Sequence, residues 1–300
     1  MPRETMPERL KGCGTALVTP FTKTGEIDEA ALRKLVDWQI AEGIHFLVPC
    51  GSTGEAVTMT PAEHRRVVEI TVEQAKGRVP IVAGAGSNDT AKAVAMSKDM
   101  KTAGATHLLH VSPMYNKPPQ RGIIAHFEKI AGATDLPIIV YNVPGRTGSN
   151  IEAKTTLALA KVPNITAVKE ASGNLSQITE ILRDRPDHFS VLSGDDEMTL
   201  AVMSAGGDGV ISVVSNATPK AMSQLCNVAA KGDFAAARTL HFQLLAWMKA
   251  AFIESNPIPV KAAMAMLGKM ENRLRLPLVP MDEKHNDTVK AALEAAGALR

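Results

Sequence analysis

Lys169 is the residue whose position points most directly to chemistry, because it ends the apolar run Ile165-Thr-Ala-Val168. If this run is a strand, alternation places Lys169 on the same side as Ile165 and Ala167. If that side faces the interior of a barrel, burial can lower a lysine pKa by up to ~3–5 units. The neutral amine that results can attack a carbonyl and form a Schiff base. The alternative is a lysine that points into solvent or pairs with Glu170.

Hydroxyl groups follow other apolar runs of the chain. Tyr141 lies near the end of the run before that of the lysine. A phenol with a pKa of about 10 is a poor base alone at pH 7, so a relay with Ser52 or Thr53 and the second tyrosine, Tyr115, makes chemical sense. The turn Gly51-Ser-Thr-Gly54 also offers closely spaced backbone N–H groups to a carboxylate. The alternatives are a core tyrosine with a backbone partner and an ordinary tight turn.

Arg146 follows the same run as Tyr141 and is flanked by glycines. Its guanidinium could bind a carboxylate bidentately, and the alternative is a solvated surface arginine. His107 and His110 are three residues apart in one predicted strand, so they point to opposite faces and cannot share a metal. We therefore expect anion binding rather than metal binding.

Three adjacent acids, Asp195-Asp-Glu197, resemble a metal cluster by type alone. They also follow a predicted strand directly and precede helix-periodic sequence, where the helix dipole favours negative charge. The helix-start interpretation is preferred, and no metal site is expected.

The elements that must position these residues alternate between short apolar runs and helix-periodic segments. The eight runs are 14–19, 44–50, 80–86, 106–112, 137–143, 165–169, 189–194 and 209–214. Eight βα units predict an α/β fold of the (β/α)₈, or TIM, barrel type, with the active site at the C-terminal ends of the strands. A doubly wound nucleotide-binding sheet is disfavoured because Gly84-Ala-Gly-Ser-Asn-Asp89 breaks the glycine fingerprint at its last position.

A helical segment is expected at 28–41, which begins at Asp28. Another is expected from Thr60-Pro-Ala-Glu63 onward, because these residues have the pattern of a capping box with proline at the first helical position. Ala-rich helical sequence dominates after residue 220, at 220–231, 233–253, 259–270 and 287–298. We predict a barrel over residues 1–232 that carries the active site and a C-terminal helical domain over 233–300.

Composition excludes several classes of function. The formal net charge is only +2, so a polyanionic partner such as nucleic acid is not expected. Three widely spaced cysteines fit a reducing compartment and no disulfide framework. The N-terminal residues lack an apolar signal region, and no run of 18 uncharged apolar residues occurs, so neither secretion nor membrane insertion is expected. We expect a cytoplasmic protein.

Seven segments, taken together and in order, resemble the dihydrodipicolinate synthase family of the class I pyruvate aldolase (N-acetylneuraminate lyase) superfamily. They are Gly51-Ser-Thr-Gly-Glu55, Ser112-Pro-Met-Tyr-Asn-Lys-Pro118, Tyr141-Asn-Val-Pro-Gly-Arg-Thr-Gly148, Val168-Lys-Glu-Ala-Ser-Gly173, Leu192-Ser-Gly-Asp-Asp196, Gly209-Val-Ile-Ser-Val213 and Glu254-Ser-Asn-Pro-Ile-Pro-Val-Lys261. The resemblance covers nearly the whole chain, and it outweighs the alternatives that each residue allows singly.

The resemblance implies a lyase that condenses pyruvate with L-aspartate-4-semialdehyde to 4-hydroxy-tetrahydrodipicolinate in diaminopimelate and lysine biosynthesis. Lys169 would form the Schiff base with pyruvate, and Tyr141 would donate and accept the proton beside it. Ser52 and Tyr115 would complete the relay, with Tyr115 reaching into the site of a neighbouring subunit. The implied assembly is a homotetramer built from tight dimers.

Four further residues would bind the substrates. The resemblance assigns Thr53 to the pyruvate carboxylate, Arg146 to the carboxylate of aspartate semialdehyde, and Gly194 with the carbonyl of Ile211 to the pyruvate pocket. It implies no metal and no organic cofactor, since the covalent Schiff base supplies the activation.

Two other functions remain open at this point. One is another pyruvate-dependent 2-keto acid aldolase, of the N-acetylneuraminate lyase or 4-hydroxy-2-oxoglutarate aldolase type; Arg146, Tyr115 and the segment beginning at Asn256 weigh against it. The other is a non-catalytic keto-acid-binding barrel, which the retention of the reactive groups disfavours.

Feedback inhibition is where the chain departs from the lysine-inhibited members of the family. Their regulatory pocket uses serine, histidine, an acid and tyrosine at positions that here are Ala56, Pro61, Lys92 and Met114, while Asn88 and His64 are retained. An acid replaced by Lys92 repels the ammonium groups of lysine. We therefore expect weak or absent inhibition by lysine.

Overall fold

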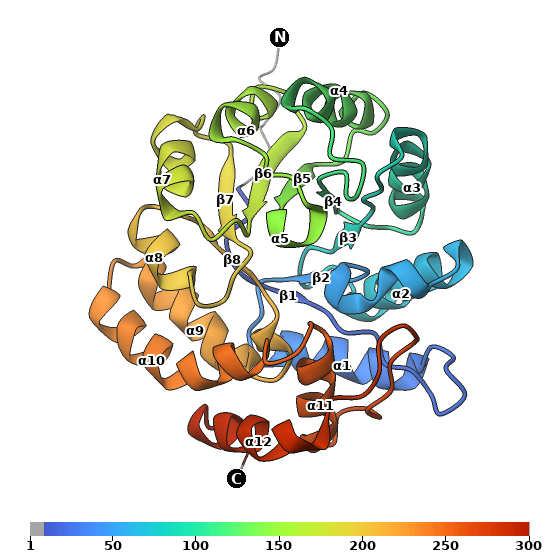
Figure 1. Cartoon of the computed structure of the whole chain (residues 1–300), viewed down its shortest axis with the longest axis vertical. Coiled ribbons are helices and arrows are strands. Elements are labelled where there is room, and N and C mark those ends of the chain that lie inside the picture. The colour runs from blue at the N-terminus through green and yellow to red at the C-terminus, as the bar shows by residue number, and fades with distance from the viewer. Residues whose placement is uncertain (1–8, 300) are drawn as a thin grey trace.

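The computed structural model describes residues 9–299, and its centre is a ring of eight parallel strands (Figure 1). The strands are β1 (Gly12–Ala16), β2 (Phe46–Val48), β3 (Val82–Gly84), β4 (His107–Val111), β5 (Ile138–Asn142), β6 (Ile165–Glu170), β7 (Ser190–Ser193) and β8 (Gly209–Ser212). Their order is β2-β1-β8-β7-β6-β5-β4-β3, and a parallel bridge between Leu47 and Ile81 joins the two ends. Each strand overlaps one of the eight predicted runs, so the predicted (β/α)₈ barrel is confirmed.

Helices cover the outside of the ring, except for the short α5, which lies over one end of the barrel (Figure 1). Between the strands and after β8 they are α1 (Glu29–Ala41), α2 (Pro61–Ala75), α3 (Thr90–Thr102), α4 (Gln120–Ala131), α5 (Pro144–Thr147), α6 (Ala153–Leu159), α7 (Leu175–Asp184), α8 (Thr199–Ser204) and α9 (Pro219–Ala230). Asp28 caps α1 by accepting from the Ala31 N–H, and Thr60 and Glu63 form the predicted capping box of α2. These caps explain why both helices begin where the sequence indicates.

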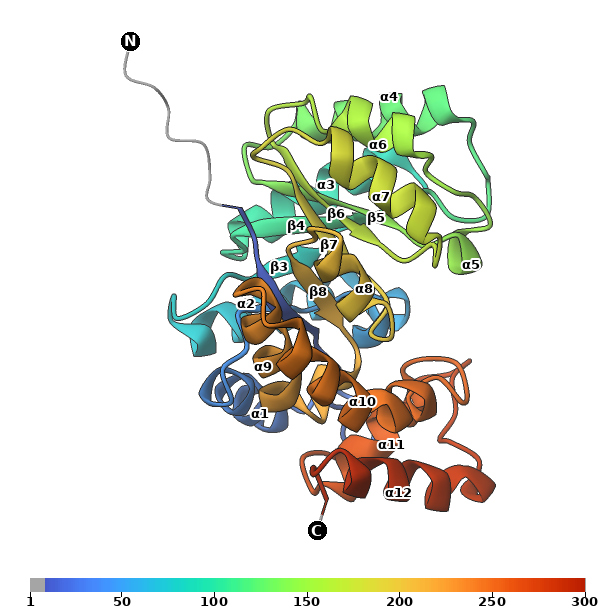
Figure 2. The same ribbon diagram turned by 90° about the vertical axis from the view of Figure 1, so that its left-hand side faces the viewer.

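The C-terminal part of the chain forms α10 (Phe234–Ala250), α11 (Ile258–Met266) and α12 (Asn286–Ala295), with the short 3₁₀ turn η4 (Glu283–His285) before α12. Figure 2 shows these helices gathered beside α9 and α1. The indole N–H of Trp247 in α10 donates to the carbonyl of Val214, directly after β8, at 3.1 Å. The division of the chain at residue 232 stays a prediction. Within residues 9–299, no helix combines the length and apolar character needed to cross a membrane.

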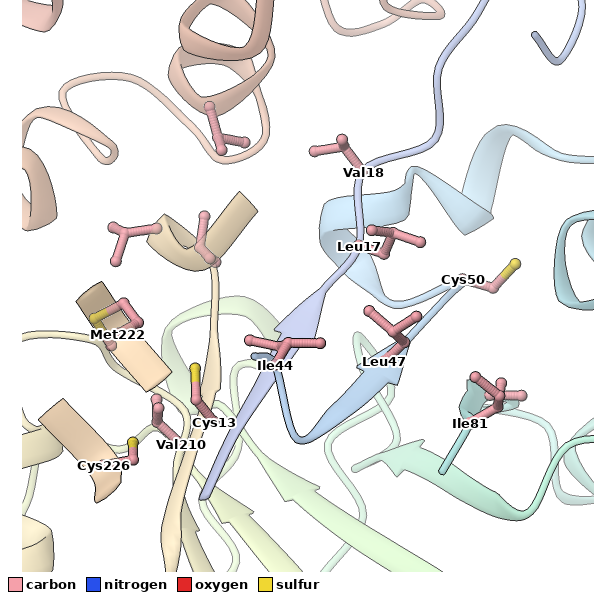
Figure 3. Close-up of a cluster of buried hydrophobic side chains, with 14 of the residues drawn as sticks. Cys13, Leu17, Val18, Ile44, Leu47, Cys50, Ile81, Val210, Met222 and Cys226 are labelled. Atoms are coloured by element: carbon pink, nitrogen blue, oxygen red, sulfur yellow. The ribbon is translucent and has the colours of Figure 1, made fainter. Parts of the chain in front are cut away.

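Apolar side chains form two layers, because successive residues of a strand point to opposite faces. The inner layer fills the barrel and includes Phe46, Leu109, Ile139 and Ile211. The outer layer lies between strands and helices. Figure 3 shows part of the outer layer, with residues of β1 and β8 beside Met222 and Cys226 of α9.

Strand β6 is irregular at its start. The register with β5 shifts between Ile138, which pairs with Ile165, and Ile139, which pairs with Ala167. This β-bulge inserts one residue, so Ile165 lies in the outer layer and Ala167 in the inner one. The expectation that Ile165 shares a side with Lys169 is therefore wrong, whereas the expectation for Ala167 is correct.

A buried ion pair joins the C-terminal helices to the turn after β2. The Lys261 side chain of α11 is fully buried, and its Nζ donates to Glu55 Oε1 at 2.6 Å and to the Thr19 carbonyl at 2.8 Å. The second oxygen of Glu55 accepts from the Arg275 backbone N–H at 3.0 Å. Burial lowers the pKa of Lys261 to about 8, and the Glu55 carboxylate limits this decrease. The hydrogen bonds of this pair therefore connect Thr19, near the N-terminus, and the C-terminal residues Lys261 and Arg275 to the turn that contains Glu55.

We predict that Lys261→Met lowers the free energy of unfolding by roughly 3–5 kcal/mol, because it leaves the Glu55 carboxylate buried without its partner. Lys284→Met is the matched control, since the Lys284–Asp282 pair is largely exposed and should contribute little to stability. Urea unfolding followed by circular dichroism measures both. Equal, small losses in the two variants would contradict the prediction.

Candidate active site

A cavity of about 300 Å³ opens at the C-terminal ends of the barrel strands. Six of the eight predicted site residues line it: Ser52, Thr53, Tyr141, Arg146, Lys169 and Gly194. They come from four separate βα units, and the parallel ring brings them together because every strand ends at the same rim. The other two predicted site residues, Ile211 and Tyr115, do not line the cavity. Ile211 lies in the inner apolar layer.

Lys169 lies inside the barrel and is only 5% exposed. It pairs with Tyr141 across β5 and β6, and its Nζ is 4.2 Å from the centre of the Tyr141 ring. Burial lowers the pKa of Lys169 to about 7; the Asp196 carboxylate opposes this decrease and the Arg146 guanidinium adds to it. A substantial fraction of the amine is therefore neutral near pH 7. The alternative of a solvated lysine, or one paired with Glu170, is wrong.

Tyr141 is buried in the same place, but burial raises its pKa where it lowers that of Lys169. Burial raises the pKa of its phenol to about 12, and the Arg146 guanidinium acts against the increase. The phenol therefore stays protonated at neutral pH, when the neighbouring amine is partly free. The pair thus combines a nucleophile with a proton donor.

The turn after β2 forms a 3₁₀ helix, η1 (Ser52–Gly54), and Thr53 is buried in it. Asn256 holds this turn, because its Nδ2 donates to Thr53 Oγ1 at 2.9 Å. The Asn256 carbonyl also accepts from Arg146 Nη2 at 3.1 Å. Asn256, which lies in the loop before α11, therefore contacts both predicted carboxylate anchors. From the sequence, Asn256 is included only in the segment Glu254–Lys261, which carries part of the family resemblance, and it is assigned no role of its own.

Tyr115 lies away from the cavity of its own chain. Its side chain is 89% exposed, and its backbone N–H donates to the Thr147 carbonyl at 3.2 Å. Its φ of +72° is unusual for a residue other than glycine, so the loop holds this tyrosine in a specific outward orientation. A single chain does not bring Tyr115 to Tyr141.

Asp196 has a different role from the one expected for the acids after β7. Helix α8 begins three residues later, at Thr199, and Asp196 is buried. Its Oδ2 accepts from the backbone N–H groups of Val213 and Val214, at 3.0 and 3.3 Å, and so holds the turn after β8. Burial raises the pKa of Asp196 to about 6, while these hydrogen bonds act in the opposite direction. Asp196 stands in the turn that leads into α8, where its carbonyl accepts from the Thr199 N–H at 3.2 Å, but its side chain bonds to the turn after β8 rather than to this helix.

Gly194 provides space next to the lysine. A Cβ atom there would lie 2.7 Å from the Ala171 side chain and 3.1 Å from two carbons of Lys169. The absence of a side chain therefore allows the lysine stem to extend into the cavity.

The described residues contain no group of three or more His, Cys, Asp or Glu side chains arranged to hold a metal ion. His110 is buried, and its Nε2 lies 3.1 Å from Ser97 Oγ of α3. His107 contacts Thr106 instead. The groups that could bind a ligand are the Arg146 guanidinium and the hydroxyl groups of η1, which suit carboxylates.

The fold and cavity together define a class of protein: a (β/α)₈ barrel with a buried, partly neutral lysine facing a tyrosine. A neutral lysine amine is what Schiff-base chemistry requires. The chain belongs to the dihydrodipicolinate synthetase family, whose model matches residues 9–296.

Relatives are similar over almost their whole length. The chain is 52% identical to 4-hydroxy-tetrahydrodipicolinate synthase of Koribacter versatilis, covering 97% of this chain and 98% of the relative. Its identity with the enzyme of that name from Maridesulfovibrio salexigens is 50%, covering 96% and 99%.

Solved structures agree. Dihydrodipicolinate synthase from Thermotoga maritima superposes with a TM-score of 0.95 at 42% identity, covering 97% of this chain and all of that one. A monomeric dihydrodipicolinate synthase variant also superposes with a TM-score of 0.95, at 42% identity, covering 97% and 98%.

We predict that Schiff-base formation at Lys169 increases with pH around a midpoint near 7, because only the neutral amine attacks a carbonyl. Asp196→Asn should move the midpoint to lower pH, since it removes the negative charge that favours the protonated lysine. Trapping of pyruvate with cyanoborohydride between pH 5.5 and 9.5, with the adduct quantified by mass spectrometry, measures both midpoints. A midpoint above pH ~9 in the wild-type protein would show that burial does not control this amine.

Proposed function

We propose that this chain condenses pyruvate with L-aspartate-4-semialdehyde to give 4-hydroxy-tetrahydrodipicolinate, the committed step of diaminopimelate and lysine biosynthesis. The observation that carries the proposal is the buried Lys169 amine, which shares one cavity with Tyr141 and Arg146. The near full-length similarity to synthases of that name supports the choice of reaction.

In the proposed mechanism the neutral Lys169 amine adds to the pyruvate ketone, and loss of water gives an iminium. The positive charge acidifies the methyl group, and loss of a proton gives an enamine. The enamine carbon attacks the aldehyde, whose oxygen takes up a proton. The amine of the semialdehyde then adds to the iminium carbon and displaces Lys169, which is released as the free amine. Tyr141 donates and accepts the protons.

The substrate anchors are proposed to divide between the two carboxylates. Thr53 binds that of pyruvate, in a pocket completed by Gly194 and the Ile211 carbonyl, and Arg146 binds that of the semialdehyde. The contacts of Asn256 with Thr53 and Arg146 support this division, because they fix both anchors relative to each other. No metal or organic cofactor takes part in these steps.

The proton relay is proposed to need a second copy of the chain, with Tyr115 of one subunit next to Ser52 of another. A mostly apolar hollow of about 300 Å³ supports this proposal: it lies beside the cavity, shares Ser52 and Arg146 with it, and is also lined by Val57. Val57 and Tyr115 are both highly exposed, as side chains at an interface are in a separated subunit. The assembly proposed is a cytoplasmic homotetramer formed from two such dimers.

Lys169→Ala is expected to lower kcat roughly 10³-fold or more, because no other group can form the covalent intermediate. A coupled assay with pyruvate and aspartate semialdehyde measures the loss, and borohydride reduction should attach a three-carbon adduct to Lys169 only in the wild type. Lys161→Ala, at an exposed lysine, is the control and should retain full activity. Turnover of N-acetylneuraminate without condensation activity would contradict the proposed substrate.

Weak or absent inhibition by lysine is expected. Lys92 is exposed on α3, and its charge opposes a dicationic ligand at the position where inhibited relatives carry an acid. Condensation activity titrated with lysine checks this expectation. Half-maximal inhibition at a submillimolar concentration would show it to be wrong.

A further inference from the structure

A second buried polar group lies on the outer side of β5 and β6, and its centre is Glu170. This carboxylate is 1% exposed. Asn142 Nδ2 donates to both of its oxygens at 3.1 Å, Gln177 Nε2 donates to Oε2 at 3.1 Å, and the Ser172 N–H donates to Oε1 at 2.8 Å. We call these four residues the Glu170 network.

The network occupies the rung of the sheet next to the reactive pair. Asn142 pairs with Glu170 as Tyr141 pairs with Lys169. Because consecutive side chains of a strand point to opposite faces, Tyr141 and Lys169 point into the barrel, whereas Asn142 and Glu170 point outward. The hydrogen bonds of the network therefore clamp β5 to β6 at the level where the amine and the phenol face each other.

The network also ties down the segment that carries Arg146. Asn142 Oδ1 accepts from the Ile151 N–H at 2.9 Å, and Asn142 Nδ2 donates to Asn150 Oδ1 at 2.8 Å. Asn150 is held in turn by Gln177, whose Oε1 accepts from Asn150 Nδ2 at 2.7 Å. One end of the segment between residues 142 and 151 thus bonds to the carboxylate directly, and the other end bonds to Asn142 and Gln177 of the network.

The carboxyl group of Glu170 is bonded by neutral donors alone, since none of the ion pairs among residues 9–299 includes it. Burying a carboxylate in this way is unfavourable unless hydrogen bonds satisfy it. The carboxylate accepts from all three donors at once, whereas a glutamine would turn an NH₂ group toward one of them.

We propose that Glu170 is a positioning residue for the proposed reaction, which fixes Tyr141 relative to Lys169 and the Arg146 segment relative to both. This inference rests on the proposed function. The amount of iminium that accumulates on long incubation with pyruvate depends on the Lys169 amine, whereas the rates of methyl proton transfer and of semialdehyde condensation depend on the geometry that Glu170 holds. Its loss should therefore affect the later steps selectively.

The test compares Glu170→Gln with Glu180→Gln, the same substitution at an exposed glutamate of α7. Three quantities are measured: reductive trapping of pyruvate on Lys169, exchange of the pyruvate methyl protons in deuterium oxide by NMR, and kcat and KM for aspartate semialdehyde. In Glu170→Gln we expect trapping close to wild type, with methyl exchange and kcat reduced roughly 10²-fold, the scale of a misplacement of about 1 Å. Glu180→Gln should match the wild type throughout.

The outcomes separate this inference from the proposed function. A wild-type protein that neither traps pyruvate nor exchanges its methyl protons contradicts the proposed function. If the wild type does both, then normal exchange in Glu170→Gln, or an equal loss of trapping and exchange, overturns the positioning role. Should Glu170→Gln fail to fold, Gln177→Leu removes one donor and keeps the carboxylate. It must show the same selective loss, to a smaller extent, or the inference is wrong.

Discussion

The rest of the site depends on the removal of one amine from water. Inside the closed barrel, Lys169 has a pKa of about 7, because burial disfavours its ammonium form. The same burial keeps the phenol of Tyr141 protonated, with a pKa of about 12. One physical cause therefore prepares both partners, the nucleophile by removing its proton and the donor by retaining it. The ring of strands creates this environment, because its inner layer excludes water beneath the cavity.

Burial of this kind requires support from outside the barrel. The Glu55–Lys261 pair and the contacts of Asn256 come from the segment around α11, yet they act on η1 and Arg146. The C-terminal helices thus belong to the site, although they contribute no strand to the ring. A rigid outer frame is what allows polar groups to keep a fixed geometry in a region of low dielectric constant.

The sequence was sufficient to predict the strands and the polar residues at their ends, because these follow local patterns. It was insufficient to predict features that depend on contacts between residues far apart in the chain. Eight apolar runs predicted the ring, and polar residues at or after their ends predicted five of the cavity residues, to which the family resemblance added Gly194. The bulge at Ile165 was not predictable, because the register between two strands is a property of the pair. Asp196 could not be distinguished from its acidic neighbours by type, since its partners are backbone groups 17 and 18 residues away. Asn256 lies 203 residues from Thr53, and no local pattern reports that contact.

Asp196 links the electrostatics of the free enzyme to those of the proposed intermediate. Burial raises the pKa of Asp196 to about 6 and lowers that of Lys169 to about 7, so the carboxylate and the amine both titrate near neutral pH. A negative charge beside the amine raises the amine's pKa and so opposes the neutral form. The same charge favours an iminium, which carries a permanent positive charge at that position. A carboxylate that slightly reduces the concentration of the nucleophile therefore stabilises what the nucleophile forms.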